Sequence, residues 1–588
     1  MVDLLIRGGT LVDGTGTKPF TGDIAVKDGR IVELGGRISS AAARTIDADG
    51  LLVTPGFVDV HTHFDGQLTW DSQLEPSFSH GVTTIVAGNC GVGFAPVRPG
   101  KQQDLIKLME GVEDIPGAVL SEGIKWSWES FPEYMDAIGK LSFSMDVGTQ
   151  IPHGALRAYA MGQRGFDDLQ ASDTDIAAMA QLVEEAVRAG ALGVSTSRSE
   201  AHQSSTGQAV PGTWAEQREL MALAEGVQRG GGGVLQAIPT LMDGYENPGL
   251  AIERTTTARE VEMLGEVSRA TGCTVTYLLL QNGRKPDEWR ECLAASDAAN
   301  ALGAKVIPQV PGRPIGTLVS LGTYHLFMGR PTYRKIADLP LARRAAEMRK
   351  SEVRAAILAE KDLPPASAAL NDNLHLILAN FLDAAFPLAD KLDYDPGAEG
   401  SIAAIAQRKG IDPMAAIYDE FVKQDGKAFV GFYVLGYQQR NFRPLHEMLT
   451  HSNSVLGLGD GGAHTRFACD ASTQTFMLSH WAQEAAGDLR LPVEFAVRKM
   501  AADTARLYGF NDRGVLGLGK RADLNLIDLQ NLALGKPEVH HDLPAGGARI
   551  LQASSGYVGT FVAGVQTRDH DQDTGERPGR LIRRQMFG

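Results

Sequence analysis

The stretch Pro55-Gly56-Phe57-Val58-Asp59-Val60-His61-Thr62-His63 is apolar at nearly every position and ends in two histidines two residues apart. The apolar run predicts a strand buried on both faces, as in a parallel sheet covered by helices. Alternate side chains of a strand share a face, so His61 and His63 would lie on the face of Phe57 and Asp59. Two imidazoles on one face can bind one cation, and the pair therefore predicts half of a metal site.

A chance pair of surface histidines is the alternative interpretation. The metal site is favoured because the pair ends a buried strand and the chain has only 14 histidines. Val58, Val60 and Thr62, which have the other parity, would then face the covering helices.

The length and charge of the chain limit its class. With 588 residues the chain is too long for one small core, which predicts a large barrel with a smaller second domain. A composition of 43% hydrophobic and 22% charged residues is typical of a globular protein. The net charge of −15 argues against nucleic-acid binding, which needs clustered Lys and Arg, and indicates an acidic solvated surface.

The sequence shows no signal peptide and no run of about 18 apolar residues, so a cytoplasmic enzyme with no membrane contact is expected. The four cysteines are too few and too scattered for a disulfide framework and are expected to be reduced thiols. Cys273, Cys292 and Cys469 lie in ordinary contexts, whereas Cys90 lies in a glycine-rich turn.

Short β-like runs separated by turns occur at the two ends of the chain. Asp28-Gly29 between two such runs predicts a type I′ hairpin. Similar patterns return only at residues 522–528 and 557–566. The ends are therefore expected to pair into one small β-sandwich, built from residues 1–54 and 511–588.

Between the ends, helix, glycine and strand alternate, which indicates parallel βαβ units. Counting the histidine strand gives eight strands, the number that closes a (β/α)₈ barrel, over residues 55–510. The other seven are expected at residues 84–90, 143–151, 192–196, 234–238, 273–281, 305–310 and 455–460. Residues 330–440 form a longer, mostly helical insertion, either a lid over the barrel mouth or a structural flap.

The motifs on this α/β framework resemble the amidohydrolase superfamily, and more closely its N-acyl-D-amino-acid deacylase (D-aminoacylase) branch. The resemblance rests on the histidine strand and on four further segments. These segments are Gly88-Asn89-Cys90-Gly91-Val92, His153-Gly154-Ala155-Leu156-Arg157, Gly190-Ala191-Leu192-Gly193-Val194-Ser195-Thr196 and Gly459-Asp460-Gly461-Gly462-Ala463-His464. The late Ala502-Asp503-Thr504-Ala505-Arg506-Leu507-Tyr508-Gly509 completes it.

The resemblance implies a Zn²⁺ site in which Cys90 replaces the bridging lysine of the superfamily and Asp460 is the catalytic aspartate. Thiolate is a good zinc ligand, although Cys90 could also be a small buried hydrophobe in its turn. Asp460 could instead form an Asx turn. With His61 and His63, these residues would hold the metal and Asp460 would move the proton.

The resemblance also implies a histidine at the ends of the fifth and sixth strands, but the corresponding segments carry Gln236 and Leu280-Gln281. A neutral amide is a poor zinc ligand, so a single metal is expected. Histidines that could rebuild a second site are His153, His202, His325 and His464, each of which could equally be structural.

The expected activity is hydrolysis of a non-peptide amide, by default of an N-acyl-D-amino acid. Arg466 or Arg198 would bind the substrate carboxylate unless each forms a salt bridge, and His153 and His464 would donate to the developing oxyanion. The alternatives are chemistry on an ester, lactone, cyclic amide or carboxylic acid, or a catalytically silent binding protein. The partner is then a small molecule, and a homo-oligomer stays open.

Overall fold

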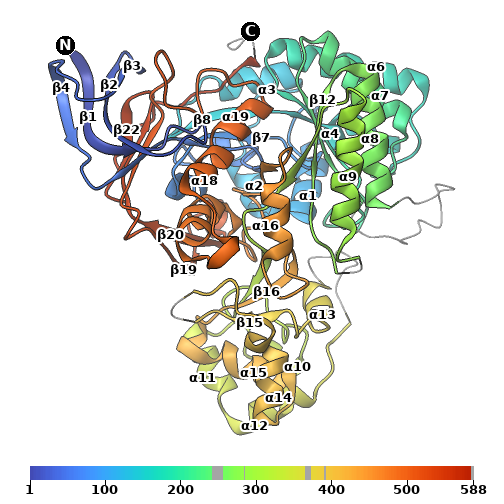
Figure 1. Ribbon diagram of the computed structural model, residues 1–588. Helices are drawn as coiled ribbons and strands as arrows, with labels where there is room; N and C mark the ends of the chain where they lie inside the picture. The colour runs from blue at the N-terminus through green and yellow to red at the C-terminus, as the bar shows by residue number, and fades with distance from the viewer. Residues whose placement is uncertain (241–255, 284, 365–372, 390–391, 585–588) are drawn as a thin grey trace.

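The computed structural model describes residues 1–240, 256–283, 285–364, 373–389 and 392–584 (Figure 1). Among these residues, no helix combines the length and the apolar character needed to cross a membrane.

The two ends of the chain meet in one nine-stranded sheet. Its order is β23-β22-β21-β18-β5-β1-β2-β3, with β4 paired to β1, and β5 and β18 join the two ends in antiparallel register. Asp28 and Gly29 both have positive φ, 50° and 72°, as the hairpin pattern predicts. The strands are β1 (Val2–Leu11), β2 (Phe20–Lys27), β3 (Arg30–Gly35), β4 (Ala42–Asp47), β5 (Leu52–Pro55), β18 (Leu524–Ile527), β21 (Tyr557–Val562), β22 (Val565–Asp569) and β23 (Gln572–Asp573).

All eight expected central strands are present, the third of them in two pieces interrupted at Gln150. They are β6 (Phe57–Asp59), β7 (Val82–Ala87), β8 (Asp146–Thr149) with β9 (Ile151–Pro152), β10 (Gly193–Ser197), β11 (Val234–Ile238), β12 (Thr274–Leu278), β13 (Val306–Val310) and β17 (Val455–Leu456). Parallel pairing runs from β6 through β7 to β8, and from β9 through β10, β11, β12 and β13 to β17.

The residues that follow β6 and β17 also meet each other. Thr62 and Gly461 form a parallel bridge, the His63 N–H donates to the Gly461 carbonyl at 2.8 Å, and the Asp460 N–H donates to the His61 carbonyl at 3.0 Å. These bonds bring the histidine pair and Asp460 to the same end of the strands.

Long helices follow the strands, and their ends match the sequence signals. Ser172 caps α6 with a capping box to Asp175, and Gly190 ends α6 with φ 116°. The helices outside the inserted region are α1 (Gln102–Glu113), α2 (Gly117–Gly123), α3 (Phe131–Ile138), α4 (His153–Met161), α5 (Gln163–Phe166), α6 (Asp173–Ala189), α7 (Gln217–Arg229), α8 (Thr257–Thr271), α9 (Glu288–Ala301), α16 (Arg443–Thr450), α17 (Thr473–Phe476), α18 (Val493–Met500) and α19 (Ala502–Leu507).

The faces of the histidine strand are those predicted from parity. Val58 and Val60 pack with Leu507, Tyr508 and Phe510 of the α19 end. The His61 and His63 side chains lie on the opposite face and are 0% and 1% exposed.

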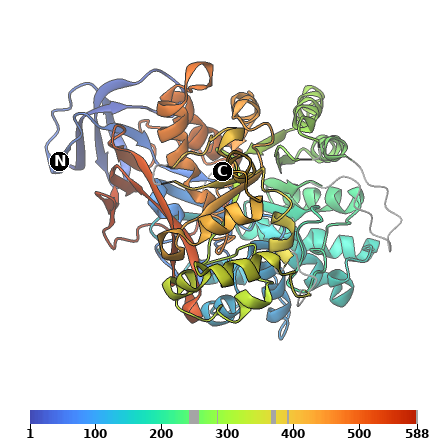
Figure 2. The same cartoon turned by 90° about the horizontal axis from the view of Figure 1, so that it is seen from below.

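The inserted region is a separate lobe with its own hydrophobic core, which projects downward in Figure 1 and faces the viewer in Figure 2. It begins earlier than expected, because β14 (Ile315–Val319) joins its three-stranded antiparallel sheet. The other described elements are α10 (Pro331–Arg334), α11 (Leu341–Met348), α12 (Ser351–Ala359), α13 (Leu374–Leu378), β15 (Ala385–Pro387), α14 (Ile402–Lys409), α15 (Pro413–Phe421) and β16 (Val430–Leu435).

Two C-terminal segments lie outside the nine-stranded sheet. β19 (Ala533–His540) and β20 (Arg549–Ser555) form a hairpin of their own, and the Ile550 N–H donates to the Thr465 carbonyl at 2.7 Å. Further on, Gly579 and Leu581 bridge to Phe143 and to Val147 of β8. The tail of the chain therefore contacts the central strands directly.

Candidate metal centre

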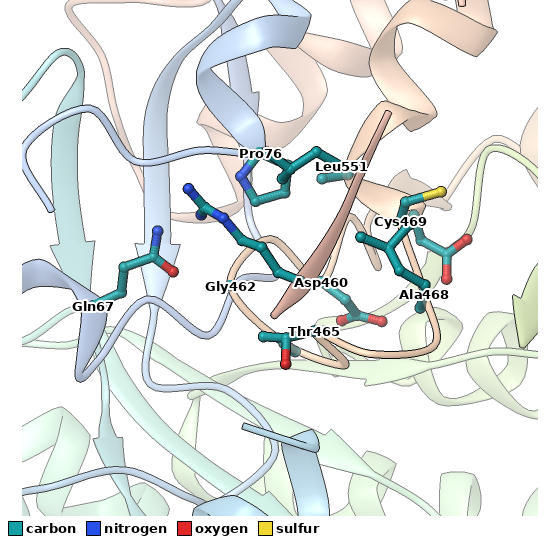
Figure 3. A pocket seen from close by; sticks show the side chains of 13 residues that line it. Gln67, Pro76, Asp460, Gly462, Thr465, Ala468, Cys469 and Leu551 are labelled. Atoms are coloured by element: carbon teal, nitrogen blue, oxygen red, sulfur yellow. The ribbon is translucent and has the colours of Figure 1, made fainter. Parts of the chain in front are cut away.

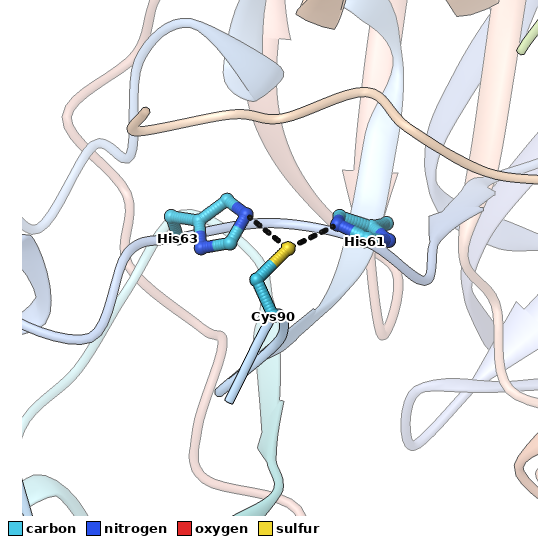
Figure 4. A group of neighbouring side chains, drawn as sticks. All are labelled: His61, His63 and Cys90. Carbon is cyan, nitrogen blue, oxygen red and sulfur yellow. Dashed lines mark hydrogen bonds between the residues drawn. The ribbon is translucent and has the colours of Figure 1, made fainter. Parts of the chain in front are cut away.

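Four donor atoms converge where β6, β7 and β17 end. His61 Nε2 lies 3.3 Å from Cys90 Sγ and 3.4 Å from Asp460 Oδ1. His63 Nε2 lies 3.7 Å from each of the same two atoms. Figure 4 shows both imidazoles turned toward the Cys90 sulfur, and the two histidines and Cys90 form one buried group of metal-ligating side chains.

These separations fit a single zinc ion. Ligands held about 2.0–2.3 Å from a tetrahedral zinc lie roughly 3.3–3.8 Å from one another. The four separations from the two imidazoles lie in that range. The buried group whose donor atoms all lie within 4.8 Å of one another comprises His61, His63 and Cys90, and Asp460 lies beside both imidazoles outside that group.

Cys90 and Asp460 reach this point through unusual backbone conformations. Their φ angles are 56° and 46°, in the left-handed region that non-glycine residues seldom adopt. Such a conformation costs on the order of 1–3 kcal/mol and persists where the surroundings hold it, commonly at functional sites. Both ligand turns are therefore built by the fold at some cost in stability.

The outer nitrogens of the two histidines face oxygen atoms. His61 Nδ1 is 2.9 Å from Gln309 Oε1, and His63 Nδ1 is 3.3 Å from Glu113 Oε1. When Nδ1 carries the proton toward such an oxygen, the Nε2 lone pair is free to bind a metal.

Burial sets the charge preferences of the site. Burial lowers the pKa of His61 to about 4, although the hydrogen bond to Gln309 raises it. Burial also raises the pKa of the Cys90 thiol well above its usual value, and Glu113 and Asp460 raise it further. A divalent cation has the opposite effect on the thiol, because it stabilises the thiolate, and it binds the neutral imidazole.

Glu113 is a residue that the sequence did not single out. It is the last residue of α1, 1% exposed, and lies between His63 and His464, whose Nε2 is 3.7 Å from Glu113 Oε2. Nothing in the local sequence distinguishes it from any other acidic residue at a helix end, because its role depends on contacts with two distant segments.

Asp460 also borders a pocket, which Figure 3 shows from close by. One wall is the segment 462–471, and the other is the start of β20 with Arg549, Ile550 and Leu551. The hairpin and the segment after Asp460 thus form the walls of a pocket beside the carboxylate. The sequence contains no signal that would place the C-terminal hairpin beside Asp460.

His153 lies on the other side of β10 from the donor atoms. Its Nδ1 is 2.9 Å from Thr196 Oγ1, and its Nε2 is 2.8 Å from Glu219 Oε1. Thr196 and Ser195 are adjacent in β10, so their side chains lie on opposite faces. The Ser195 hydroxyl accepts a hydrogen bond from the Gly91 N–H, beside Cys90. The structure therefore places His153 in a buried network with Arg157 and does not bring it to the ligands.

Arg198 and His325 are likewise placed away from the four donor atoms. Arg198 donates to Glu260 Oε1 at 3.0 Å and to the Ala215 carbonyl at 2.6 Å. His325 lies in the inserted lobe, with its ring 4.3 Å from that of Tyr333. Arg198 therefore forms a salt bridge with Glu260 and does not face the donor atoms.

Arg466 and His464 belong to the segment that follows Asp460, and His202 follows β10. Arg466 donates through Nε to both carboxylate oxygens of Asp114, at 3.1 and 3.3 Å, and lies over the Tyr324 ring. The His464 side chain is 26% exposed. His202 Nδ1 is 2.9 Å from Ser197 Oγ.

Comparison with known proteins gives matches over most of the chain. The family model described as amidohydrolase family matches residues 44–568. An uncharacterized protein of Mycobacterium tuberculosis is 27% identical over 555 residues, which cover 90% of this chain and 85% of that protein. The D-aminoacylase of Alcaligenes xylosoxydans xylosoxydans is 39% identical over 196 residues, 33% of this chain and 37% of that enzyme.

A solved structure shares the fold. The N-acyl-D-glutamate deacylase of Bordetella bronchiseptica, determined with zinc and a phosphonate mimic of the tetrahedral intermediate, superposes with a TM-score of 0.64. The match covers 99% of both chains at 24% identity.

Proposed function

The chain belongs to the amidohydrolase family, in its D-aminoacylase-like branch, and we propose that it is a metal-dependent hydrolase of N-acyl-D-amino acids. The observation that carries the proposal is that His61 Nε2 and His63 Nε2 each lie 3.3–3.7 Å from Cys90 Sγ and from Asp460 Oδ1. We further propose that the eight parallel strands close into a (β/α)₈ barrel, residues 55–510, beside a β domain built from residues 1–54 and 511–588.

One zinc ion would be held by His61, His63, Cys90 and Asp460. Bound there, it supplies a Lewis acid that lowers the pKa of water toward about 7 and polarises a carbonyl. The two imidazoles and the thiolate would fix its position. Gln309 would orient the His61 ring, and Glu113 Oε1 lies 3.3 Å from His63 Nδ1.

Asp460 would carry the proton. Its carboxylate borders the pocket beside the ligands, where it can orient the attacking water and accept its proton. The same carboxyl group then gives the proton to the nitrogen of the leaving amine. Burial in that pocket excludes competing water from the leaving nitrogen.

The substrate would bind where Asp460 borders the pocket. His464, partly exposed and held near Glu113, is placed to donate to the acyl oxygen. Arg466 could bind a carboxylate that competes with Asp114 for its guanidinium. The D-amino-acid configuration and the single metal are part of the proposal, and the relatives that bear deacylase names support it.

Metal removal tests the ligand set. We expect about one zinc per chain after gentle purification, loss of that zinc with a chelator at low pH, and recovery of amide hydrolysis on adding back one equivalent. The measurement is elemental analysis of the same samples that are assayed on N-acyl-D- and N-acyl-L-amino acids.

A panel of esters, lactones, cyclic amides and simple carboxylic acids serves as the control for reaction class. Full amide hydrolysis by protein that contains no transition metal would refute the metal-dependent mechanism. Turnover confined to the lactones or carboxylic acids would refute the deacylase assignment while leaving the metal site in place.

A further inference from the structure

Two buried glutamine side chains each contact one of the candidate ligand residues. Gln236 of β11 accepts a hydrogen bond from the backbone N–H of Cys90, with 3.1 Å between Oε1 and the nitrogen. Gln309 of β13 places its Oε1 2.9 Å from His61 Nδ1. Both side chains are 0% exposed. Each amide therefore contacts a different ligand residue from inside the strand framework.

These contacts decide which end of each amide faces the ligand. A backbone N–H can only donate, so the oxygen of Gln236 must face Cys90. His61 Nδ1 carries the proton when Nε2 binds a metal, so the oxygen of Gln309 must face His61. The NH₂ groups are then directed away from the ligand residues.

Both NH₂ groups lack an acceptor among the described residues. The Nε2 atoms of Gln236 and Gln309 are buried and make no hydrogen bond within that part of the chain. A buried donor without an acceptor costs about 1–3 kcal/mol. Both unpaired donors belong to side chains that contact a candidate ligand residue, and an acceptor oxygen placed there would offset this cost.

We propose that Gln236 and Gln309 are positioning residues for Cys90 and His61, and that their NH₂ groups donate to the reacting carbonyl oxygen of the substrate. This proposal rests on the proposed function, because it assumes that the reacting carbonyl binds beside the ligands. Fixed amide donors would stabilise negative charge that develops on that oxygen, as oxyanion-hole donors do.

The turn of Cys90 offers a matched control. Gly91 N–H, next to Cys90, donates to Ser195 Oγ at 3.0 Å, and Ser195 is in register with Gln236 across β10 and β11. Ser195→Ala therefore loosens the same turn from the neighbouring strand without removing an amide donor.

The variants Gln236→Glu and Gln309→Glu separate the two roles, because glutamate keeps an acceptor oxygen for the ligand and loses the NH₂ group. Gln236→Leu and Gln309→Leu remove both. Each protein is loaded with Co²⁺, whose thiolate absorption reports the Cys90 bond without any turnover. The same samples are titrated with methylphosphonate, a stable mimic of a tetrahedral oxyanion, and assayed for kcat and KM.

We expect the Glu variants to keep the cobalt–thiolate band, to bind methylphosphonate more weakly, and to lose about 10²- to 10³-fold in kcat. The Leu variants should in addition bind Co²⁺ about 10- to 100-fold more weakly. Ser195→Ala should weaken Co²⁺ binding less than Gln236→Leu does and leave methylphosphonate affinity unchanged.

Three results would overturn the proposal. Glu variants with wild-type kcat and methylphosphonate affinity would show that the NH₂ groups do not donate. Leu variants with wild-type Co²⁺ affinity would remove the positioning role. Equal losses in Ser195→Ala and Gln236→Leu would assign the effect to the turn alone. Failure of the wild-type protein on every amide would refute the proposed function, whereas the cobalt and methylphosphonate measurements would still decide this inference.

Discussion

Replacing Asp460 with asparagine should lower kcat by about 10²- to 10⁴-fold on the best amide substrate, the usual contribution of a general acid–base group. Asparagine keeps the shape of the side chain and one oxygen near the His61 and His63 nitrogens. It cannot accept the proton of the attacking water or return it to the leaving amine. The loss should therefore appear in kcat, with a smaller change in KM.

The metal content of Asp460→Asn distinguishes a loss of proton transfer from a loss of the metal site. His61, His63 and Cys90 still converge on one point, so we expect the variant to retain close to one metal per chain. Elemental analysis and steady-state kinetics on the same preparation make the comparison. Unchanged turnover would remove Asp460 from the mechanism, and loss of both metal and activity would limit it to the role of a ligand.

The convergence of the candidate ligand residues could be predicted in part from the sequence, because it depends on local order. Strand parity alone places His61 and His63 on one face, and parallel strands bring their carboxyl ends to one edge. Cys90 and Asp460 follow two such strands within a few residues, and the resemblance to the deacylase branch assigned them to the site.

Residues whose role depends on a distant partner could not be predicted in this way. His153 follows a strand directly, yet its two ring nitrogens contact Thr196 and Glu219, which hold it on the helix side. Arg198 finds its partner 62 residues away, in Glu260. Glu113 reaches the site only because α1 ends beside His63. Sequence spacing does not specify these packing relations.

The C-terminal tail also differs from the sequence prediction. Its contacts lead to a buried ion-pair network. Residues 579–584 bond to β8 and to Gly190 rather than joining the nine-stranded sheet. Asp146 of β8 accepts from the Arg580 N–H at 3.0 Å and pairs with Arg513 at 2.8 Å and with Arg521 at 3.1 Å. The Asp146 side chain is 1% exposed. One carboxylate thus ties three later segments to the central strands.

Asp146→Asn should therefore reduce the free energy of unfolding by about 3 kcal/mol, near the lower limit for breaking a buried ion pair. The loss stays near that limit because Asp512 still pairs with Arg513 at 2.9 Å, and Asp523 with Arg521 at 3.0 Å. Arg513→Met alone and combined with Asp146→Asn closes a double-mutant cycle, in which the pair should show coupling. The measurement is denaturant unfolding followed by fluorescence and circular dichroism, compared where the two signals coincide.

Asp136→Asn is the matched control, since Asp136 also pairs with the tail, through Arg583, but at the surface, where the two side chains are 67% and 30% exposed. An exposed pair contributes about 0–1 kcal/mol, so this variant should unfold almost as the wild type does. If Asp146→Asn costs no more than Asp136→Asn, the buried network does not anchor the tail, and the apolar contacts of Leu581 and Ile582 must hold it instead. Leu581→Ala would then give the larger loss of the two.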